Sequence, residues 1–182
     1  AYKPARERIT QFNINWNIIS WPGRAWAKRM FPDMSIEKAQ ESLANAIFKA
    51  SRVDCDDPIT AWEKHNSNLR VKSDWLNKKN FYALHFKGPG TDLKVGLAQE
   101  HEWMGGASKA QNGVTCNPNI PSEEVFTTPH ANLVEGTVCS TKPLSHQGSL
   151  IDNIQVKFRE GKIIEAHASK GEKVLNKVLD SD

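Results

Sequence analysis

The sequence predicts a mixed α/β (α+β) chain whose first part is rich in helices and whose second part is rich in strands. Residues 1–80 contain stretches with apolar residues at helical spacing, whereas residues 81–182 contain alternating stretches separated by Gly and Pro. The composition, with 38% hydrophobic residues and six Trp, suits a chain that can fill a core. We therefore expect a division near Asn80, between part of an N-terminal α/β domain (1–80) and a β-rich segment (81–182).

The first part opens with an alternating stretch. Every second residue from Phe12 to Ile18 is apolar, and asparagines lie between them, which predicts a strand with one buried face. The following stretch, residues 24–31, predicts a short helical turn that ends at Pro32.

Two longer helices are predicted next, each with a recognisable start. Ser35 is placed to cap a helix over residues 36–50. Asp57 as the cap and Pro58 at the first helical position begin a second, longer helix. His65 lies close to the apolar side of that helix, so we expect it to donate a hydrogen bond to a neighbour rather than to bind a ligand.

A single strand cannot satisfy its own backbone hydrogen-bonding groups. We therefore expect the strand of the first part to pair with strands upstream of Ala1 or in a partner chain. The chain starts at Ala1 rather than Met and ends at Asp182 directly after a helical pattern. Either end is consistent with a cut through a longer protein.

The second part is predicted to be mainly strands. Gly161 lies in a short hairpin loop, where a residue with a positive φ is needed, and residues 170–182 predict a short amphipathic helix. The predicted strands cover residues 81–86, 92–98, 124–129 and 136–144, and the two sides of the hairpin within 149–169.

Charge and cysteine content exclude several classes of protein. The 24 basic and 21 acidic residues are interspersed, so the net charge of +3 forms no basic patch of the kind that binds nucleic acid. No apolar run approaches the length of a membrane span. The three Cys follow no metal-binding or disulfide pattern and fit a reducing compartment. We expect a cytoplasmic protein with neither nucleic acid nor membrane as a partner.

Two adjacent carboxylates, Glu123 and Glu124, precede the apolar residues Val125 and Phe126. On an extended chain they point to opposite faces, so they cannot easily bind the same ion. If this stretch is a strand, Glu124 shares a face with Phe126, and a carboxylate buried there would need a cation. The alternative is that both acids lie in a solvated turn after Pro121.

Several stretches resemble the thermophilic metallo-aminopeptidase family, which includes aminopeptidases T and S. The most specific are the GPGTDL turn at 88–93 and PSEEVFTTP at 121–129. The resemblance covers most of the chain, in consistent order, through residues 21–33, 84–97, 103–106, 117–130, 135–158 and 161–175.

This resemblance implies an N-terminal α/β domain followed by a domain that holds two divalent metal ions (zinc, cobalt, manganese or magnesium). It identifies Glu124 as the family's first metal glutamate and leaves Glu123 as a supporting or surface acid. The family's other ligands and its catalytic tyrosine lie in motifs that do not occur in this sequence. His130 and His146 do not fall at family ligand positions, and no catalytic residue is assigned.

The resemblance further implies a homodimeric enzyme that hydrolyses N-terminal residues from peptides with a water activated by two metals. Because the chain carries a single ligand of the set, we expect it to be inactive alone, with little or no metal bound. The alternative hypothesis is a non-catalytic module for dimerisation or peptide docking, in which Glu123 and Glu124 are simply solvated.

Overall fold

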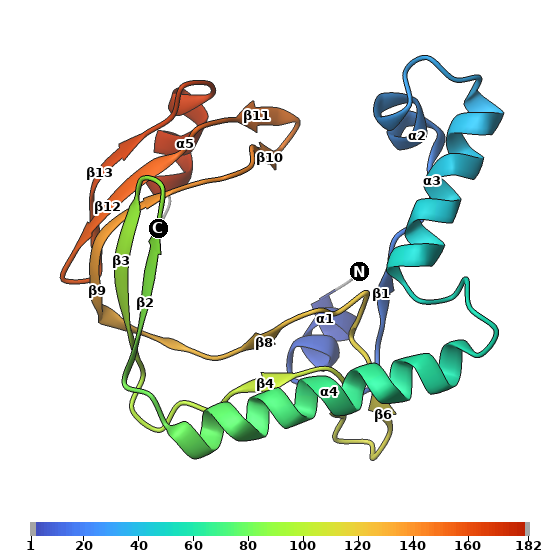
Figure 1. The fold of residues 1–182 in the computed structure, drawn as a ribbon, viewed down its shortest axis with the longest axis horizontal. Helices are drawn as coiled ribbons and strands as arrows, with labels where there is room; N and C mark the ends of the chain where they lie inside the picture. The colour runs from blue at the N-terminus through green and yellow to red at the C-terminus, as the bar shows by residue number, and fades with distance from the viewer. Residues whose placement is uncertain (1–2, 181–182) are drawn as a thin grey trace. The chain divides into compact units, whose positions relative to one another are not determined.

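The computed structural model describes residues 3–180. They form two compact units: unit 1 comprises the described residues up to Leu76 together with Trp103–Phe126, and unit 2 comprises Asn77–Glu102 together with the described residues from Thr127 on. Helices and strands are both present, which confirms the mixed α/β class (Figure 1). The predicted division into domains near Asn80 concerns the intact protein and stays a prediction, but the chain returns once to unit 1.

Unit 1 contains the helices of the first part. They are α1 (Lys3–Thr10), α2 (Arg24–Met30), α3 (Ile36–Ala50) and α4 (Pro58–Lys79). Both predicted caps are confirmed. The Ser35 hydroxyl accepts a hydrogen bond from the backbone N–H of Lys38 at 3.4 Å, and the Asp57 carboxylate accepts one from that of Thr60 at 3.0 Å. Helix α1 was not predicted.

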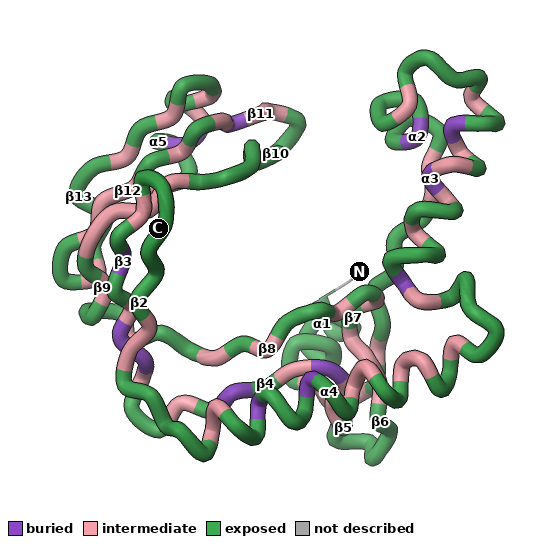
Figure 2. The backbone as a smooth tube through the Cα atoms, in the orientation of Figure 1, coloured by how far each residue is buried: buried purple, intermediate pink, exposed green. Residues whose placement is uncertain are grey.

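The α2–α3 pair encloses a small apolar core. Ala27 and Ala39 are fully buried, Leu43 is nearly so, and Phe31 and Ile47 pack against them. Figure 2 shows the buried residues of α2 and α3 on adjoining sides of the two helices. Helical spacing of these residues is what allows the two helices to share one face.

The predicted strand over residues 12–18 is wrong for most of its length. Within residues 12–18 and the residue that follows, only Ile18–Ile19 (β1) is a strand, and it pairs in parallel with Asn119–Ile120 (β7) of the same chain. Phe12 has a φ of 54°, which ends any extended run there. Asn17 donates to the Asn117 carbonyl at 2.6 Å and Asn15 accepts a hydrogen bond from the side chain of Asn112 at 3.0 Å, so these exposed asparagines also contact loops far along the chain.

Two further short strand pairs complete unit 1. β4 (Met104–Gly105) is antiparallel to β8 (Val125–Phe126), and β5 (Ser108–Lys109) is antiparallel to β6 (Thr115–Cys116). The segment 103–126 therefore returns the chain to unit 1, and the pair of glutamates lies directly before its last strand, β8.

Unit 2 is built on an antiparallel five-stranded sheet, whose strands in chain order are β2 (Ala83–Gly88), β3 (Thr91–Leu97), β9 (Pro129–Cys139), β12 (Gln155–Arg159) and β13 (Lys162–His167). Their order across the sheet is β13-β12-β9-β3-β2. A hairpin of β10 (Leu144–His146) and β11 (Ser149–Ile151) and the helix α5 (Glu172–Leu179) complete the unit.

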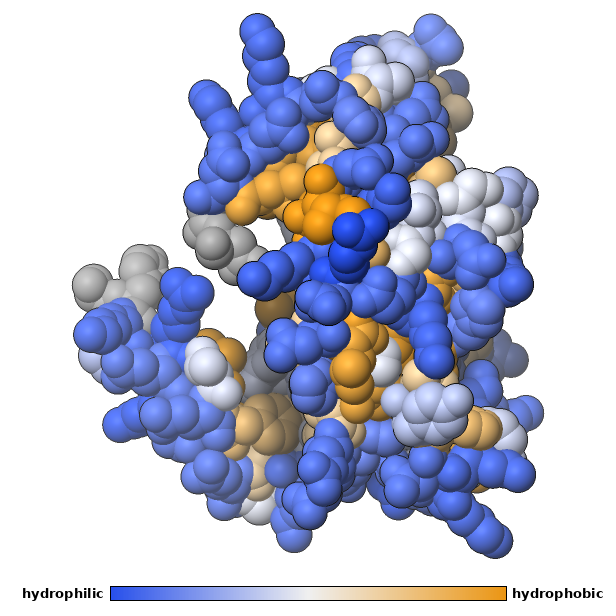
Figure 3. All heavy atoms as spheres, turned by 90° about the vertical axis from the view of Figure 1, so that its left-hand side faces the viewer, coloured by the Kyte–Doolittle hydropathy of each residue, from blue (hydrophilic) through white to orange (hydrophobic). Residues whose placement is uncertain are grey.

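The β12–β13 hairpin and the last helix confirm the sequence predictions for this part, whereas the strand predicted over residues 136–144 is interrupted after Cys139 and the β10–β11 hairpin was not predicted. Gly161 has a φ of 76° in the β12–β13 turn, as expected. Leu175 of α5 is buried, and so is Ile151 of β11. Figure 3 shows apolar patches between hydrophilic side chains on the face that it views. None of the helices within residues 3–180 has the length and apolar character needed to cross a bilayer.

Candidate functional site

The loop of residues 117–124 leads to the pair of glutamates and is anchored at its start by α4 and β1. The side-chain amides of Asn66 and Asn117 exchange two hydrogen bonds, at 2.9 and 2.8 Å. The Pro118 carbonyl accepts a hydrogen bond from the N–H of Ile18 at 2.8 Å, next to the β1–β7 pairing. A paired amide of this kind, only partly exposed, fixes both the position and the orientation of the loop.

His65 of α4 holds the middle of the loop. Its Nε2 lies 2.6 Å from the carbonyl oxygen of Ser122, and because a carbonyl can only accept, Nε2 must carry the proton. The ring of Trp62 meets the His65 ring edge to face, with centroids 5.4 Å apart, and fixes the plane of the imidazole. The prediction that His65 donates to a neighbour is confirmed.

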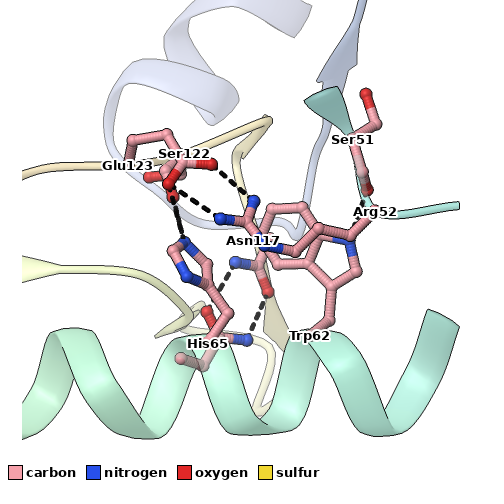
Figure 4. Close-up of polar contacts among 8 residues, drawn as sticks. Ser51, Arg52, Trp62, His65, Asn117, Ser122 and Glu123 are labelled. Atoms are coloured by element: carbon pink, nitrogen blue, oxygen red, sulfur yellow. Dashed lines mark hydrogen bonds and ion pairs between the residues drawn. The ribbon is translucent and has the colours of Figure 1, made fainter. Parts of the chain in front are cut away.

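Arg52 holds the side chain of Glu123, as Figure 4 shows. Its Nη2 donates to Oε2 at 2.8 Å and its Nη1 donates to Oε1, so both carboxylate oxygens are engaged. The guanidinium also lies over the Trp62 ring, 5.6 Å from its centroid. The Trp62 indole N–H donates to the Ser51 carbonyl at 2.8 Å, so the aromatic platform is itself fixed.

The ion pair keeps both groups charged. The hydrogen bonds from Arg52 are the main cause of a pKa of Glu123 below its usual range, and those bonds also raise the pKa of Arg52. The side chains are 29% and 55% exposed for Arg52 and Glu123, so solvent screens the attraction. The pair therefore stabilises the fold by at most about 1 kcal/mol, and its main effect is geometric.

Glu124 differs from Glu123. Its side chain is exposed, and within residues 3–180 no hydrogen bond or ion pair engages its carboxylate. Its backbone is restrained, because Gly105 lies opposite Val125 in the β4–β8 pair. A Cβ at Gly105 would come 2.6 Å from the Glu124 carbonyl oxygen, closer than atoms approach without displacement.

The predicted environment of Glu124 is wrong in one respect. The strand that follows is only Val125–Phe126, and both glutamates precede it. Glu124 was expected to lie on the same face of a strand as a buried Phe126. In this chain Phe126 is 53% exposed, so that face is accessible to solvent. Alternation is a reliable guide to burial only where a strand is paired along its length, and β8 has one neighbour over two residues.

The loop of residues 117–124 can supply one metal ligand but not a complete metal site. Glu124 offers an unengaged hard oxygen donor, whereas both oxygens of Glu123 are bound by Arg52. No group of three or more His, Cys, Asp or Glu that could hold a metal ion occurs in the described part of the chain. His130 accepts a hydrogen bond from the N–H of Asn132, and His146 lies in β10.

Arg52, Asn66 and Trp62 were not predicted as part of this site. Arg52 and Glu123 are 71 positions apart, and nothing in either local stretch indicates the partner. A basic residue at a helix C-terminus and an aromatic residue on a helix are explained as well by solvation and core packing.

Comparison with known proteins agrees with the resemblance seen in the sequence. The chain is 50% identical over 182 residues to aminopeptidase T of Thermus thermophilus, covering all of this chain and 45% of that protein. It is 40% identical over 177 residues to aminopeptidase AmpS of Bacillus subtilis, covering 97% of this chain and 43% of that protein. The solved structure of wild-type AmpT from Thermus thermophilus matches with a TM-score of 0.92 at 49% identity, covering all of this chain and 44% of that one.

The chain thus spans less than half the length of these relatives. The family model described as thermophilic metalloprotease (M29) matches residues 1–182, which is the whole of the sequence. The chain therefore belongs to the thermophilic metalloprotease family.

Proposed function

We propose that this chain is part of a longer metal-dependent aminopeptidase, in which it supplies Glu124 as one ligand of a two-metal site. Two relatives that match it are named aminopeptidases, and the family is one of metalloproteases. The substrates of the parent protein would be peptides, shortened from their N-terminus.

One observation carries the assignment of Glu124. The loop before it is fixed by side chains of α4 and by Arg52, yet its own carboxylate has no partner within the described residues. A hard oxygen donor held in place but left unpaired suits a divalent cation. When bound, a pair of such ions would activate water and polarise the scissile carbonyl.

We propose that the 182-residue chain alone does not turn over peptides. A single carboxylate cannot hold two ions, and no further ligand cluster accompanies it in the part of the chain that the structure describes. With cobalt added, hydrolysis of leucine p-nitroanilide by the chain should equal that of its Glu124→Ala variant. Turnover well above that of the variant would reveal a complete site and overturn this part of the proposal.

The test of the parent activity uses the full-length protein. Glu124→Gln should lower kcat/KM for leucine p-nitroanilide by at least about 100-fold, because a lost ligand disrupts the metal site. Glu41→Gln is the matched control: Glu41 is an exposed carboxylate on α3, outside the loop. If Glu124→Gln stays within a few fold of wild type, Glu124 is not a ligand, and a docking or dimerisation role is favoured instead.

A further inference from the structure

Most residues from Asn117 to Val125 make a contact that restrains the backbone, whereas the Glu124 carboxylate makes no hydrogen bond or ion pair with the described residues. Asn66 and Asn17 hold Asn117, and His65 holds the Ser122 carbonyl. The one free carboxylate is therefore attached to a backbone with little freedom to move.

Two contacts lie next to Glu124 itself. On its N-terminal side, the side chain of Glu123 is bound through both oxygens to Arg52. On its C-terminal side, Gly105 lies against the Glu124 carbonyl, where no Cβ fits without displacement. Glu123 and Glu124 are consecutive residues, so binding of the Glu123 side chain by Arg52 and the close approach of Gly105 to the Glu124 carbonyl both restrain the backbone that carries the Glu124 side chain.

We propose that Arg52 and Gly105 are positioning residues for the Glu124 carboxylate, and that the Arg52–Glu123 pair sets the affinity of the metal site without touching the metal. This inference rests on the proposed role of Glu124 as a ligand. Partners that orient metal ligands typically change metal affinity by about 10–100-fold when they are removed.

The structure argues against a purely stabilising role for the pair. Both side chains are accessible, with 29% and 55% exposure for Arg52 and Glu123, and exposed pairs contribute little to folding. Yet the Arg52–Glu123 pair is bidentate, and the guanidinium lies over the Trp62 ring. Such a pair fixes direction more than it adds stability.

The test measures Co²⁺ affinity of the full-length protein by competition with a chelator. Arg52→Met and Glu123→Gln should each raise the Kd of the site that needs Glu124 by about tenfold. Exchanging the charges, with Arg52→Glu and Glu123→Arg together, should recover part of the loss. Saturating Co²⁺ should restore most of kcat in the single variants, with the KM for leucine p-nitroanilide within about twofold.

Two controls separate positioning from loss of stability. Asp57→Ala removes the cap of α4 and should lower the melting temperature while it leaves the Kd unchanged. Lys157→Met removes the cation of an exposed pair with Glu165 in unit 2 and should change neither quantity. Gly105→Ala is the second probe of positioning, and it should raise the Kd without removing any charge.

The outcomes separate two claims: that Glu124 is a metal ligand, and that Arg52 and Gly105 position it. If Glu124→Gln abolishes tight Co²⁺ binding while Arg52→Met, Glu123→Gln and Gly105→Ala bind within twofold of wild type, the positioning role is wrong and the ligand role stands. If Glu124→Gln binds as tightly as wild type, the ligand role fails and the positioning role fails with it. If Asp57→Ala weakens binding as much as Arg52→Met, stability explains the effect and the positioning role is overturned.

Discussion

Arg52 and Glu123, 71 positions apart in the sequence, form a bidentate ion pair. The carboxylate of the next residue, Glu124, makes no such contact with the described residues. Two adjacent glutamates thereby take different roles. The Arg52 guanidinium binds both carboxylate oxygens of Glu123, whereas the Glu124 carboxylate remains available to a cation.

The contribution of this pair to stability should be small. In a double-mutant cycle with Arg52→Met and Glu123→Gln, we expect a coupling energy of about 0.5–1 kcal/mol at low salt. The coupling should fall further at 1 M NaCl, because solvent ions screen exposed charges. Urea unfolding of the four proteins measures it, and a coupling above about 2 kcal/mol that ignores salt would show that the pair is buried.

Two hairpin turns of unit 2 offer a matched test of backbone packing. Gln147–Gly148 and Glu160–Gly161 have the same conformation, with φ of 47° and 79° in one turn and 49° and 76° in the other. A Cβ at Gly161 would come 1.7 Å from the Ala131 carbonyl oxygen, whereas a Cβ at Gly148 would meet nothing within 4 Å.

Gly148→Ala should therefore cost only the penalty of a left-handed residue, about 1 kcal/mol. Gly161→Ala should cost about 2–4 kcal/mol, since β9 must also move away from the turn. Thermal or urea unfolding of the two variants compares them. Equal losses would mean that the Glu160–Gly161 turn does not pack against β9.

The β2–β3 hairpin predicts a dependence of stability on pH. A hydrogen bond from His85, with Nε2 2.6 Å from Asp92 Oδ1, is the main cause of a lowered pKa of Asp92, and Lys87 adds to it. A carboxyl whose pKa is lower in the folded state stabilises the fold above its unfolded pKa, about 3.9. That stability is lost as the pH falls from there through the folded pKa.

Unfolding midpoints of wild type and Asp92→Asn, measured between about pH 6 and pH 2.5, test this. The wild-type advantage should be present at pH 6 and shrink as the pH falls below 4. An unchanged difference across the range would show that Asp92 is not held in its charged form by these partners.

Much of the fold could be predicted because its signals are local. Capping residues such as Ser35 and Asp57 act within one helical turn, and a glycine such as Gly161 is required by the conformation of its own turn. The strand expected over residues 12–18 was wrong because alternation cannot show whether a partner strand exists. Its asparagines hydrogen-bond to loops, and Asn17 reaches Asn117, 100 positions away.

The candidate site, too, could be predicted only where its signals are local. The sequence indicated that only one of the two adjacent glutamates binds a given ion, because neighbouring side chains diverge. The resemblance to the family pointed to Glu124, and this role remains a prediction. The reason for the difference, Arg52, lies at the end of another helix and contacts the loop only in the folded chain. Side chains that meet through tertiary structure leave no local pattern.

The central claim is that Glu124, and not Glu123, binds a metal ion in the full-length protein. Titration with Co²⁺, followed by counting the ions retained after gel filtration, tests it in the Glu124→Gln and Glu123→Gln variants. We expect Glu124→Gln to retain fewer ions than wild type and Glu123→Gln to retain the wild-type number with a weaker affinity. Retention of the wild-type number and affinity by Glu124→Gln, with loss of an ion in Glu123→Gln, would contradict the account.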